Sequence, residues 1–309
     1  MSTKLSRDFV AADLATVNQL LDKLTDKDVF AKLGLQSRRR ELEEQLASLA
    51  TERSVSASAS LFFSGDPVLA NRGIEASFGA QAMERFQDLV TKIFAVQHTG
   101  SLGQRGSIPG KDASKLHITN VVRNSFGFRL EEMSPQANML ESPLKDAVDE
   151  ATRLMEVFGL ENEEAFESEV EELDGRVLTT IRDFFGTLSE HRATFRLVSG
   201  DVDKSFHAQN ITRAAERAKI TTLDEAEVEL AGQLAGALRE SRIFEFRPDR
   251  PQPTFIKGTI GPELTADQIS GINHRFADKD SLARFRVKSV RRNDQVLREK
   301  YTLLSIRER

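Results

Sequence analysis

The hydrophobic period changes near residue 222, and this change constrains the fold more than any other feature of the sequence. Before it, most apolar residues recur every three or four positions, the period of amphipathic α-helices. After it, they alternate in short runs, the period of β-strands. We therefore expect an α+β protein with a helical hairpin at 1–54, a mixed α+β central domain at 55–222 and a small β-rich domain at 223–309. The last part is expected to form a small curved β-sheet or a partly open β-barrel with one short helix.

The first part is expected to form two amphipathic helices over residues 9–54. Leucines at three-, four- and seven-residue steps mark both helices, and Gly34 is expected to separate them. Their heptad pattern is shorter than the three or four repeats of a coiled coil. We expect the hairpin to pack on its own domain, and homo-oligomerisation through these helices is the alternative.

The central part combines helical stripes with short strands. The longest stripe runs without interruption from Phe166 to Leu188 and predicts one continuous helix. Gly127, inside a predicted strand, indicates close backbone packing or, alternatively, the approach of a ligand. The expected elements are a strand at 61–63, a helix at 76–97, two strands within 116–133 with Asn124 between them, helices at 144–158 and 166–188, a strand at 193–199, and a helix at 208–218.

The inventory of reactive side chains is small. The chain has no Cys, no Trp, one Tyr and five His that lie far apart in sequence, which excludes thiol nucleophiles, Cys-based metal sites and closely spaced His motifs. The Gly-rich segment 99–115 is not a P-loop, because Arg105 stands where a Gly is required and Asp112 where a Ser or Thr is required. We expect no metal and no cofactor.

The composition favours a folded protein that does not enter the membrane. Of 309 residues, 39% are hydrophobic and 29% are charged, and no stretch has the apolar length that spans a bilayer. Met1 to Val10 carries charges and is not followed by the apolar run of a secretory signal. The expectation is a bacterial cytoplasmic protein that has no membrane partner.

Charge is divided unequally between segments of the chain. Residues 141–174 contain 13 acidic and two basic residues, whereas residues 284–309 contain nine basic and three acidic ones. On the strand that contains Phe285 and Val287, a period of two places Arg284, Arg286 and Lys288 on the opposite, outward face. The candidate binding residues for an acidic partner or nucleic acid are Arg284, Arg286, Lys288, Arg291, Arg292 and Tyr301. Tyr301 is expected to be an exposed aromatic.

Three classes of function follow. The first is a non-catalytic binding or assembly module of a bacterial complex, with a protein partner at the basic strand face and another at the acidic helices. The second is a nucleic-acid-associated protein, although a net charge of −5 weighs against it. The third is an enzyme, favoured less, whose site would be assembled from dispersed carboxylates. The carboxylates considered are Glu131, Glu132, Asp201 and Asp203.

The sequence leaves two further alternatives open, one for a pair of aspartates and one for the charged segments. The Asp201-Val202-Asp203 sequence precedes a predicted helix and is interpreted as a helix cap in preference to a metal ligand pair. The acidic helices could also dock on the basic strand within one molecule, and each charged surface would then hide the other.

Overall fold

The computed structural model describes residues 3–25, 28–51, 55–70, 72–103, 105–122, 126–133, 141–249, 255–293 and 295–309. The chain forms two compact units. The first comprises Met1–Glu169 and Arg176–Ala218, and the second comprises Val170–Gly175 and Lys219–Arg309. The predicted α+β class is confirmed, with a helical N-terminal segment and a curved C-terminal sheet. Within the described residues, no helix has the length and apolar content needed to cross a membrane.

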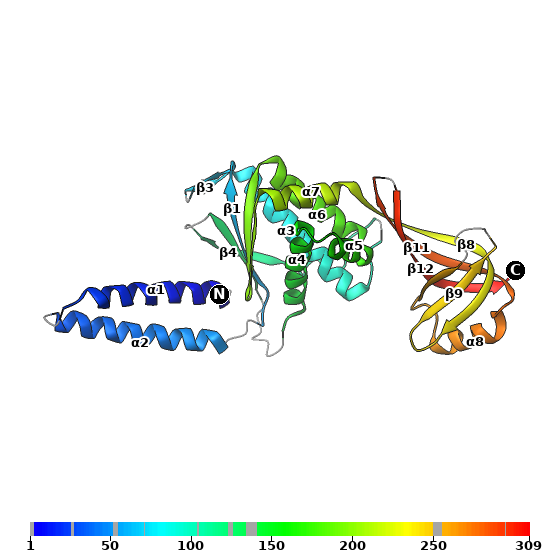
Figure 1. Ribbon diagram of the computed structural model, residues 1–309, viewed down its shortest axis with the longest axis horizontal. Helices are drawn as coiled ribbons and strands as arrows, with labels where there is room; N and C mark the ends of the chain where they lie inside the picture. The colour runs from blue at the N-terminus through cyan, green and yellow to red at the C-terminus, as the bar shows by residue number, and fades with distance from the viewer. Residues whose placement is uncertain are drawn as a thin grey trace. The chain divides into compact units, whose positions relative to one another are not determined.

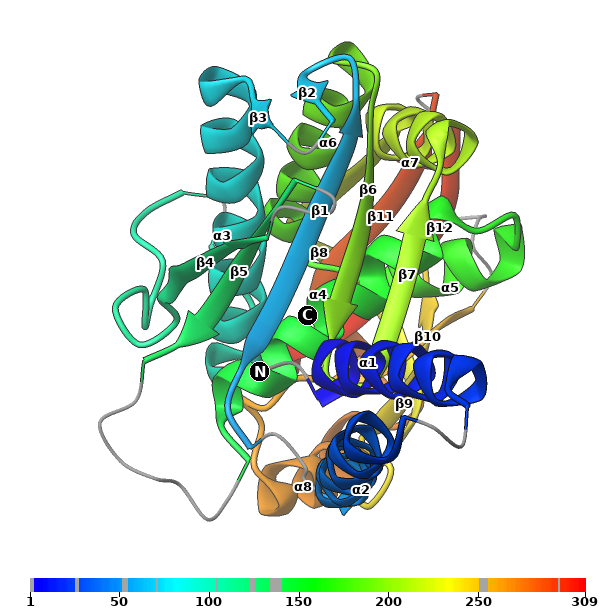
Figure 2. The same ribbon diagram turned by 90° about the vertical axis from the view of Figure 1, so that its left-hand side faces the viewer.

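The chain begins with two antiparallel helices, α1 (Thr3–Lys23) and α2 (Val29–Thr51), which lie side by side in Figures 1 and 2. The expectation that Gly34 separates them is wrong, because Gly34 lies inside α2. The two helices are connected between Lys23 and Val29, before Gly34. There the backbone N–H and hydroxyl of Thr25 both donate to the carboxylate of Asp28. These two bonds link a residue shortly after the end of α1 to the residue directly before α2.

A five-stranded antiparallel sheet forms the centre of the first unit, in the order β4-β5-β1-β6-β7. A separate two-stranded ribbon, β2 with β3, follows β1. Figure 2 shows α3, α4 and α6 on one side of the large sheet. The strands are β1 (Ser58–Gly65), β2 (Val68–Leu69), β3 (Gly73–Ile74), β4 (Leu116–Val122), β5 (Gly127–Glu132), β6 (Ala193–Ser199) and β7 (Val202–Phe206).

Phenylalanine rings join the sheet to its helices. Phe195 and Phe206 stack with centroids 4.3 Å apart on adjacent strands, and Phe184 of α6 (Gly175–Glu190) meets Phe195 edge-on at 5.3 Å. Phe63 of β1 meets Phe78 of α3 (Ala76–Thr99) edge-on at 5.5 Å. Such pairs add favourable ring geometry to the burial of large apolar side chains. Many of the 20 Phe residues of the chain are therefore part of the core.

The stripe from Phe166 to Leu188 is buried as predicted, but the continuous helix expected there is wrong. The chain forms α5 (Glu163–Glu172) and α6, with a break at Leu173 and Asp174. Asp174 is followed by Gly175, a pair that favours a turn. Leu173 lies in the break and Val177 lies after it, and they are 6% and 2% exposed. The apolar spacing thus predicts burial correctly even at residues where the backbone is not helical.

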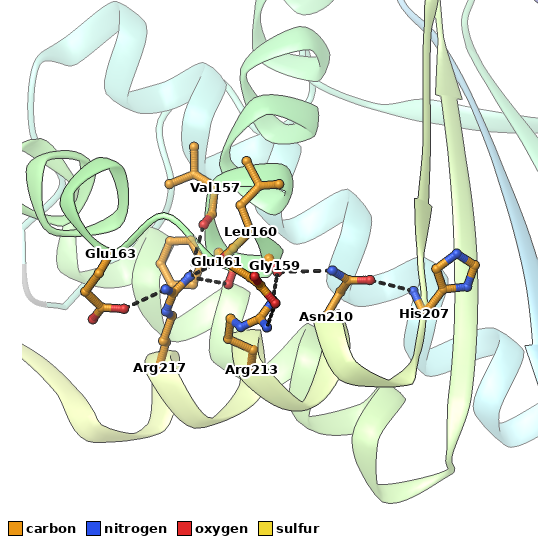
Figure 3. A network of polar contacts seen from close by, with 10 residues as sticks. Val157, Gly159, Leu160, Glu161, Glu163, His207, Asn210, Arg213 and Arg217 are labelled. Atoms are coloured by element: carbon orange, nitrogen blue, oxygen red, sulfur yellow. Dashed lines mark hydrogen bonds and ion pairs between the residues drawn. The ribbon is translucent and has the colours of Figure 1, made fainter.

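A buried cation closes the end of α4 (Pro143–Gly159). Arg217, on α7 (Ala208–Ile220), is 5% exposed, and its guanidinium donates to the carbonyl oxygens of Phe158 (3.2 Å) and Leu160 (2.5 Å). Figure 3 shows the contact with Leu160. It also donates to Glu163 at 2.6 Å and lies 4.8 Å from the ring centroid of Phe166. A cation at a helix C-terminus complements unpaired carbonyl groups there. Arg217 therefore fixes α7 against the α4–α5 turn.

The second unit contains a closed five-stranded barrel, in the cyclic order β10-β12-β11-β8-β9. Pairing of β9 with β10 completes the barrel, so the partly open form of the prediction is corrected to a closed one. All neighbours are antiparallel except β10 and β12. The elements are β8 (Thr221–Leu238), β9 (Ile243–Pro248), β10 (Ile256–Ile260), α8 (Ala266–Phe276), β11 (Asp280–Arg292) and β12 (Gln295–Glu308).

This strand order, with α8 inserted between the third and fourth strands, is the topology of the OB-fold, a small Greek-key barrel. A capping box starts α8, with the Thr265 hydroxyl accepting from the Gln268 backbone and the Gln268 side chain accepting from the Thr265 backbone. The barrel core is lined by Phe244, Phe246 and Phe285.

Two glycines, Gly232 and Gly236, lie inside the first barrel strand, the 18-residue β8. A Cβ at Gly232 would lie 2.2 Å from the carbonyl oxygen of Arg247, so only glycine permits this closeness of β8 and β9. The register between the two strands shifts between Leu234 and Gly236. Glycine here allows a long strand to bend around the barrel.

Gly127 has the packing role that the sequence favoured. A Cβ there would lie 2.7 Å from the carbonyl oxygen of Leu61 and 2.6 Å from the ring of Phe62. The neighbouring strand fills the space that a ligand would need. The predicted turn residue Asn124 lies outside the described residues.

Candidate binding surface on the C-terminal barrel

The alternation predicted for β11 is confirmed. Phe285 is fully buried and Val287 is 7% exposed in the barrel core, while Arg284, Arg286 and Lys288 lie on the other face. The two faces follow from the period of two in an extended strand. This local pattern places three of the predicted binding residues together on the outside of the barrel.

The basic face of β11 is matched by an acidic face on its neighbour β8. In the register of the two strands, Arg284, Arg286 and Lys288 lie opposite Glu229, Glu227 and Glu225. The ion pairs run diagonally: Arg284 with Glu227, and Arg286 with Glu225 at 3.2 Å. The hydrogen bond that Arg284 donates to Glu227 raises the pKa of Arg284 above its usual value. We call these six residues the charge ladder, in which opposite charges on adjacent strands attract.

Further ion pairs extend this compensation along the barrel. Arg291 lies 3.4 Å from Asp224, and Arg307 lies 3.2 Å from Glu229. Arg292, at the end of β11, pairs in register with Thr221 of β8 and Gln295 of β12. The basic strand is therefore not a bare cationic surface of the kind that binds phosphate backbones by charge alone.

Tyr301 does not provide the exposed aromatic that the sequence analysis expected. Its side chain is only 7% exposed, lies opposite the inward Val287, and meets the Phe285 ring edge-on with centroids 6.0 Å apart. The hydroxyl donates to Glu299 at 2.7 Å. Residues directly opposite in a ladder share a face, so the inward position of Val287 carries Tyr301 into the core. The expected exposure was wrong.

Part of the acidic segment contacts β12 within the second unit. That unit includes Val170–Gly175, and there Glu171 pairs with Arg298 while Glu172 accepts from Lys300 at 2.5 Å. These two pairs join opposite charges of one molecule, as the self-docking alternative anticipated for the acidic helices and β11. They involve β12, however, and the β11 arginines are paired with β8 instead.

Lys288 differs from the other residues of the ladder. It forms no hydrogen bond or ion pair with the residues that the structure describes, and its side chain is half-buried. Burial lowers the pKa of Lys288, and neighbouring Lys300 lowers it further, against the opposite influence of Glu172, Asp174 and Glu225. A cavity of about 230 Å³ adjoins it.

A second exposed feature on the barrel was missed by the sequence reasoning. Phe255, directly before β10, is 44% exposed, and the guanidinium of Arg247 on β9 lies 5.0 Å from its ring centroid. In the sequence, both residues flank segment 248–254, which contains three prolines. The available sequence signal was an aromatic residue, Phe255, directly after this segment and an alternating run of residues directly before it.

The carboxylates considered for catalysis have separate partners. Asp203 lies in β7 and accepts from Arg196 at 2.6 Å, and Lys4 lies 3.2 Å away; the hydrogen bond from Arg196 lowers the pKa of Asp203 most, followed by the one from Lys4. Asp201 pairs with Arg7. The helix-cap interpretation of both aspartates is wrong, because β7 intervenes before α7 begins at Ala208.

Glu131 and Glu132 also make contacts within the fold. Glu131 accepts from Arg129 at 2.8 Å, and Glu132 accepts from the backbone of Ala57 and the hydroxyl of Ser142. Glu132 thereby joins the end of β5 to the start of α4. Among the described residues, no group of three or more His, Asp or Glu side chains is placed to hold a metal ion.

Comparison with known proteins gives one partial similarity. No family model matches the chain, and no solved structure matches it. An acyl carrier protein from Syntrophobacter fumaroxidans is 27% identical over 81 residues, which cover 26% of this chain and 94% of the relative. This similarity reaches about a quarter of the chain and does not assign the protein to that family.

Proposed function

We propose that the protein is a non-catalytic binding or assembly module that contacts a protein partner through the turn end of its helical hairpin. The observation that carries this proposal is the exposure of large apolar side chains there. Phe30 is 92% exposed, and Val29, Leu33 and Leu20 are 54%, 58% and 45% exposed. We call these four residues the hairpin-end patch. Grouped apolar exposure of this kind is typical of interaction sites.

Charge favours the hairpin end over the surfaces proposed from sequence. The basic face of β11 already has acidic partners on β8, so an acidic partner would have to displace them. The apolar side chains of the hairpin-end patch require no such exchange. Burying Phe30 alone contributes about 1.5–3 kcal/mol to association. The basic strand and the acidic helices remain proposed secondary contacts.

The experiment compares the wild type with a Phe30→Ser/Leu33→Ser double variant. Phe9→Ser is the matched control, because Phe9 is also 70% exposed but lies near the other end of α1. Molecular mass by light scattering over a concentration series tests self-association, and quantitative co-purification from the native host tests a different partner. We expect the double variant to lose the association and Phe9→Ser to keep it. Equal behaviour of all three proteins would refute the proposal.

A second candidate function is binding of single-stranded nucleic acid on β9 and β10. OB-folds bind oligonucleotides on their second and third strands, which are β9 and β10 here; this is an argument from fold alone. The observation that favours it is the exposed Phe255 beside Arg247, because an aromatic ring with an adjacent guanidinium stacks on bases. Net charge and the charge ladder oppose it.

Fluorescence-polarisation titration with labelled single-stranded and duplex DNA and RNA, at several salt concentrations, tests this second function. Phe255→Ala should weaken binding to single strands, whereas a charge-reversed Arg284, Arg286 and Lys288 variant should change it less. If the β11 variant alone abolishes binding, the site lies on the basic strand as the sequence suggested. Absence of binding at low salt would remove nucleic acid as a ligand.

A further inference from the structure

Three lysines lie side by side on three adjacent strands of the barrel. Lys288 of β11 is directly opposite Lys300 of β12. In the parallel pairing of β10 with β12, Gly258 is the partner of Tyr301. Lys257 directly precedes Gly258 on β10, and Lys300 directly precedes Tyr301 on β12. We call Lys257, Lys300 and Lys288 the lysine row. Like charges opposite one another destabilise a sheet, so such a row needs a compensating negative charge.

Among the residues that the structure describes, two members of the row have a compensating carboxylate. Lys257 lies 2.6 Å from Glu245, and Lys300 lies 2.5 Å from Glu172. Lys288 has no such partner among the described residues, although its side chain is half-buried. Glu225, opposite it on β8, pairs instead with Arg286. A cation withdrawn from water without a partner is unfavourable for folding.

The cavity beside Lys288 is built by the second unit alone. The whole lysine row lines it, together with Arg298 and the carboxylates of Glu171, Glu172 and Glu299. Its volume of about 230 Å³ is below the roughly 300–1,000 Å³ of pockets that hold drug-sized ligands, yet it exceeds the roughly 30 Å³ that one water occupies. The space suits a small polyatomic group.

We propose that this cavity binds a compact oxyanion of the phosphate class, with Lys288 as its principal charged contact. A tetrahedral oxyanion presents several acceptor oxygens, which suits ammonium groups arriving from three strands, whereas a carboxylate presents two. The three lining glutamates disfavour a long polyanion, and two of them, Glu171 and Glu172, are neutralised by Arg298 and Lys300. This site is independent of the hairpin-end patch and does not rest on the proposed function.

The experiment is isothermal titration calorimetry of the full-length protein with inorganic phosphate at constant ionic strength. Lys288→Met keeps the length of the side chain and removes its charge, and Lys279→Met removes an exposed charge elsewhere on the barrel as a matched control. We expect saturable binding by the wild type and by Lys279→Met. Lys288→Met should bind about tenfold to a hundredfold more weakly, the range expected when a charged hydrogen bond is lost.

Further arms identify the ligand class and exclude a purely structural effect. Adenosine monophosphate that binds more tightly than phosphate would indicate a phosphate carried on an organic molecule, and free phosphate that binds more tightly would indicate the ion itself. Lys288→Arg should retain binding because it keeps the charge. A thermal melt without phosphate should show that Lys288→Met is folded.

Three results would overturn the proposal. They are no saturable binding of phosphate by the wild type at up to about 10 mM, equal affinities of the wild type and Lys288→Met, or acetate that binds as tightly as phosphate. A Phe30→Ser/Leu33→Ser variant that keeps phosphate binding would show that the phosphate site does not depend on the hairpin-end patch.

Discussion

Arg217 in the first unit and Lys288 in the second are both cations withdrawn from solvent, yet their surroundings differ completely. Arg217 donates to backbone carbonyls and to Glu163, and its guanidinium lies over the Phe166 ring. Lys288 has no hydrogen-bonded partner among the described residues and adjoins a cavity. A cation whose donors are used by the fold is a structural element, whereas one without partners can serve a ligand.

The largest effect should come from Arg217→Met. The substitution leaves the α4–α5 carbonyls without their donor and removes the contact with Phe166, so we expect the free energy of unfolding to fall by about 2–4 kcal/mol. Urea unfolding measures this loss. Arg213→Met is the control, because Arg213 reaches the Gly159 carbonyl but pairs with Glu161, whose side chain is 85% exposed. Equal losses in the two variants would contradict a special role for Arg217.

An intermediate effect is expected from Asp203→Asn, since Asp203 is 15% exposed and Arg196 is 39% exposed. The ion pair is partly screened by water, so its loss should cost about 0.5–1 kcal/mol near neutral pH. The hydrogen bond from Arg196 lowers the folded-state pKa of Asp203 below the usual 3.8. Its stabilisation is therefore present above 3.8 and is lost as the pH falls through the folded-state pKa.

Urea midpoints of the wild type and Asp203→Asn should consequently differ near neutral pH and converge in acid. Asp201→Asn is the control, because Asp201 pairs with Arg7 but is 74% exposed. A difference that persists below the folded-state pKa would show that Asp203 acts through shape and not through charge.

These contrasts also show what the sequence can predict. The alternation of β11 is a local pattern, and it correctly assigns Phe285 and Val287 to the core. The partner of each cation is set by pairing between distant strands, as with Arg286 and Glu225, and a local pattern does not contain that register. Glutamates at 225, 227 and 229 alternate in the same way as the basic residues of β11, and this match was the signal that could have revealed the charge ladder.

The same reason explains the other differences. Tyr301 is buried because β12 pairs with β11 so that it lies opposite Val287, which its own sequence neighbours do not indicate. The lysine row exists only through the β10–β12 and β11–β12 pairings. The Phe166–Leu188 stripe correctly predicted burial, whereas the break in the helix at Leu173 and Asp174 was hidden within an otherwise regular spacing.

A smaller effect is expected for an exposed rung of the charge ladder. Arg286 and Glu225 are 35% and 46% exposed, so a double-mutant cycle of Arg286→Met and Glu225→Gln should give a coupling of about 0.2–1 kcal/mol. The coupling should decrease as salt is added, because exposed charges are screened. Urea unfolding at low and high salt measures it. A larger coupling energy that does not change with salt would show that this pair is shielded from solvent, as the contacts of Arg217 are.

The smallest effect, and the one of opposite sign, is expected for Lys288→Met without phosphate. Burial lowers the folded-state pKa of Lys288 below its usual 10.5, so the charged form is disfavoured in the fold and the neutral variant should be slightly more stable at neutral pH. Between the folded-state pKa and 10.5 the unfolded chain binds more protons, so wild-type stability should rise with pH. The wild type should therefore approach the variant in thermal melts as the pH rises through this window. Phosphate should reverse the order at neutral pH by stabilising only the wild type. If Lys288→Met is instead less stable at every pH and phosphate changes neither protein, Lys288 would be a structural cation like Arg217, and the contrast between the two units would fail.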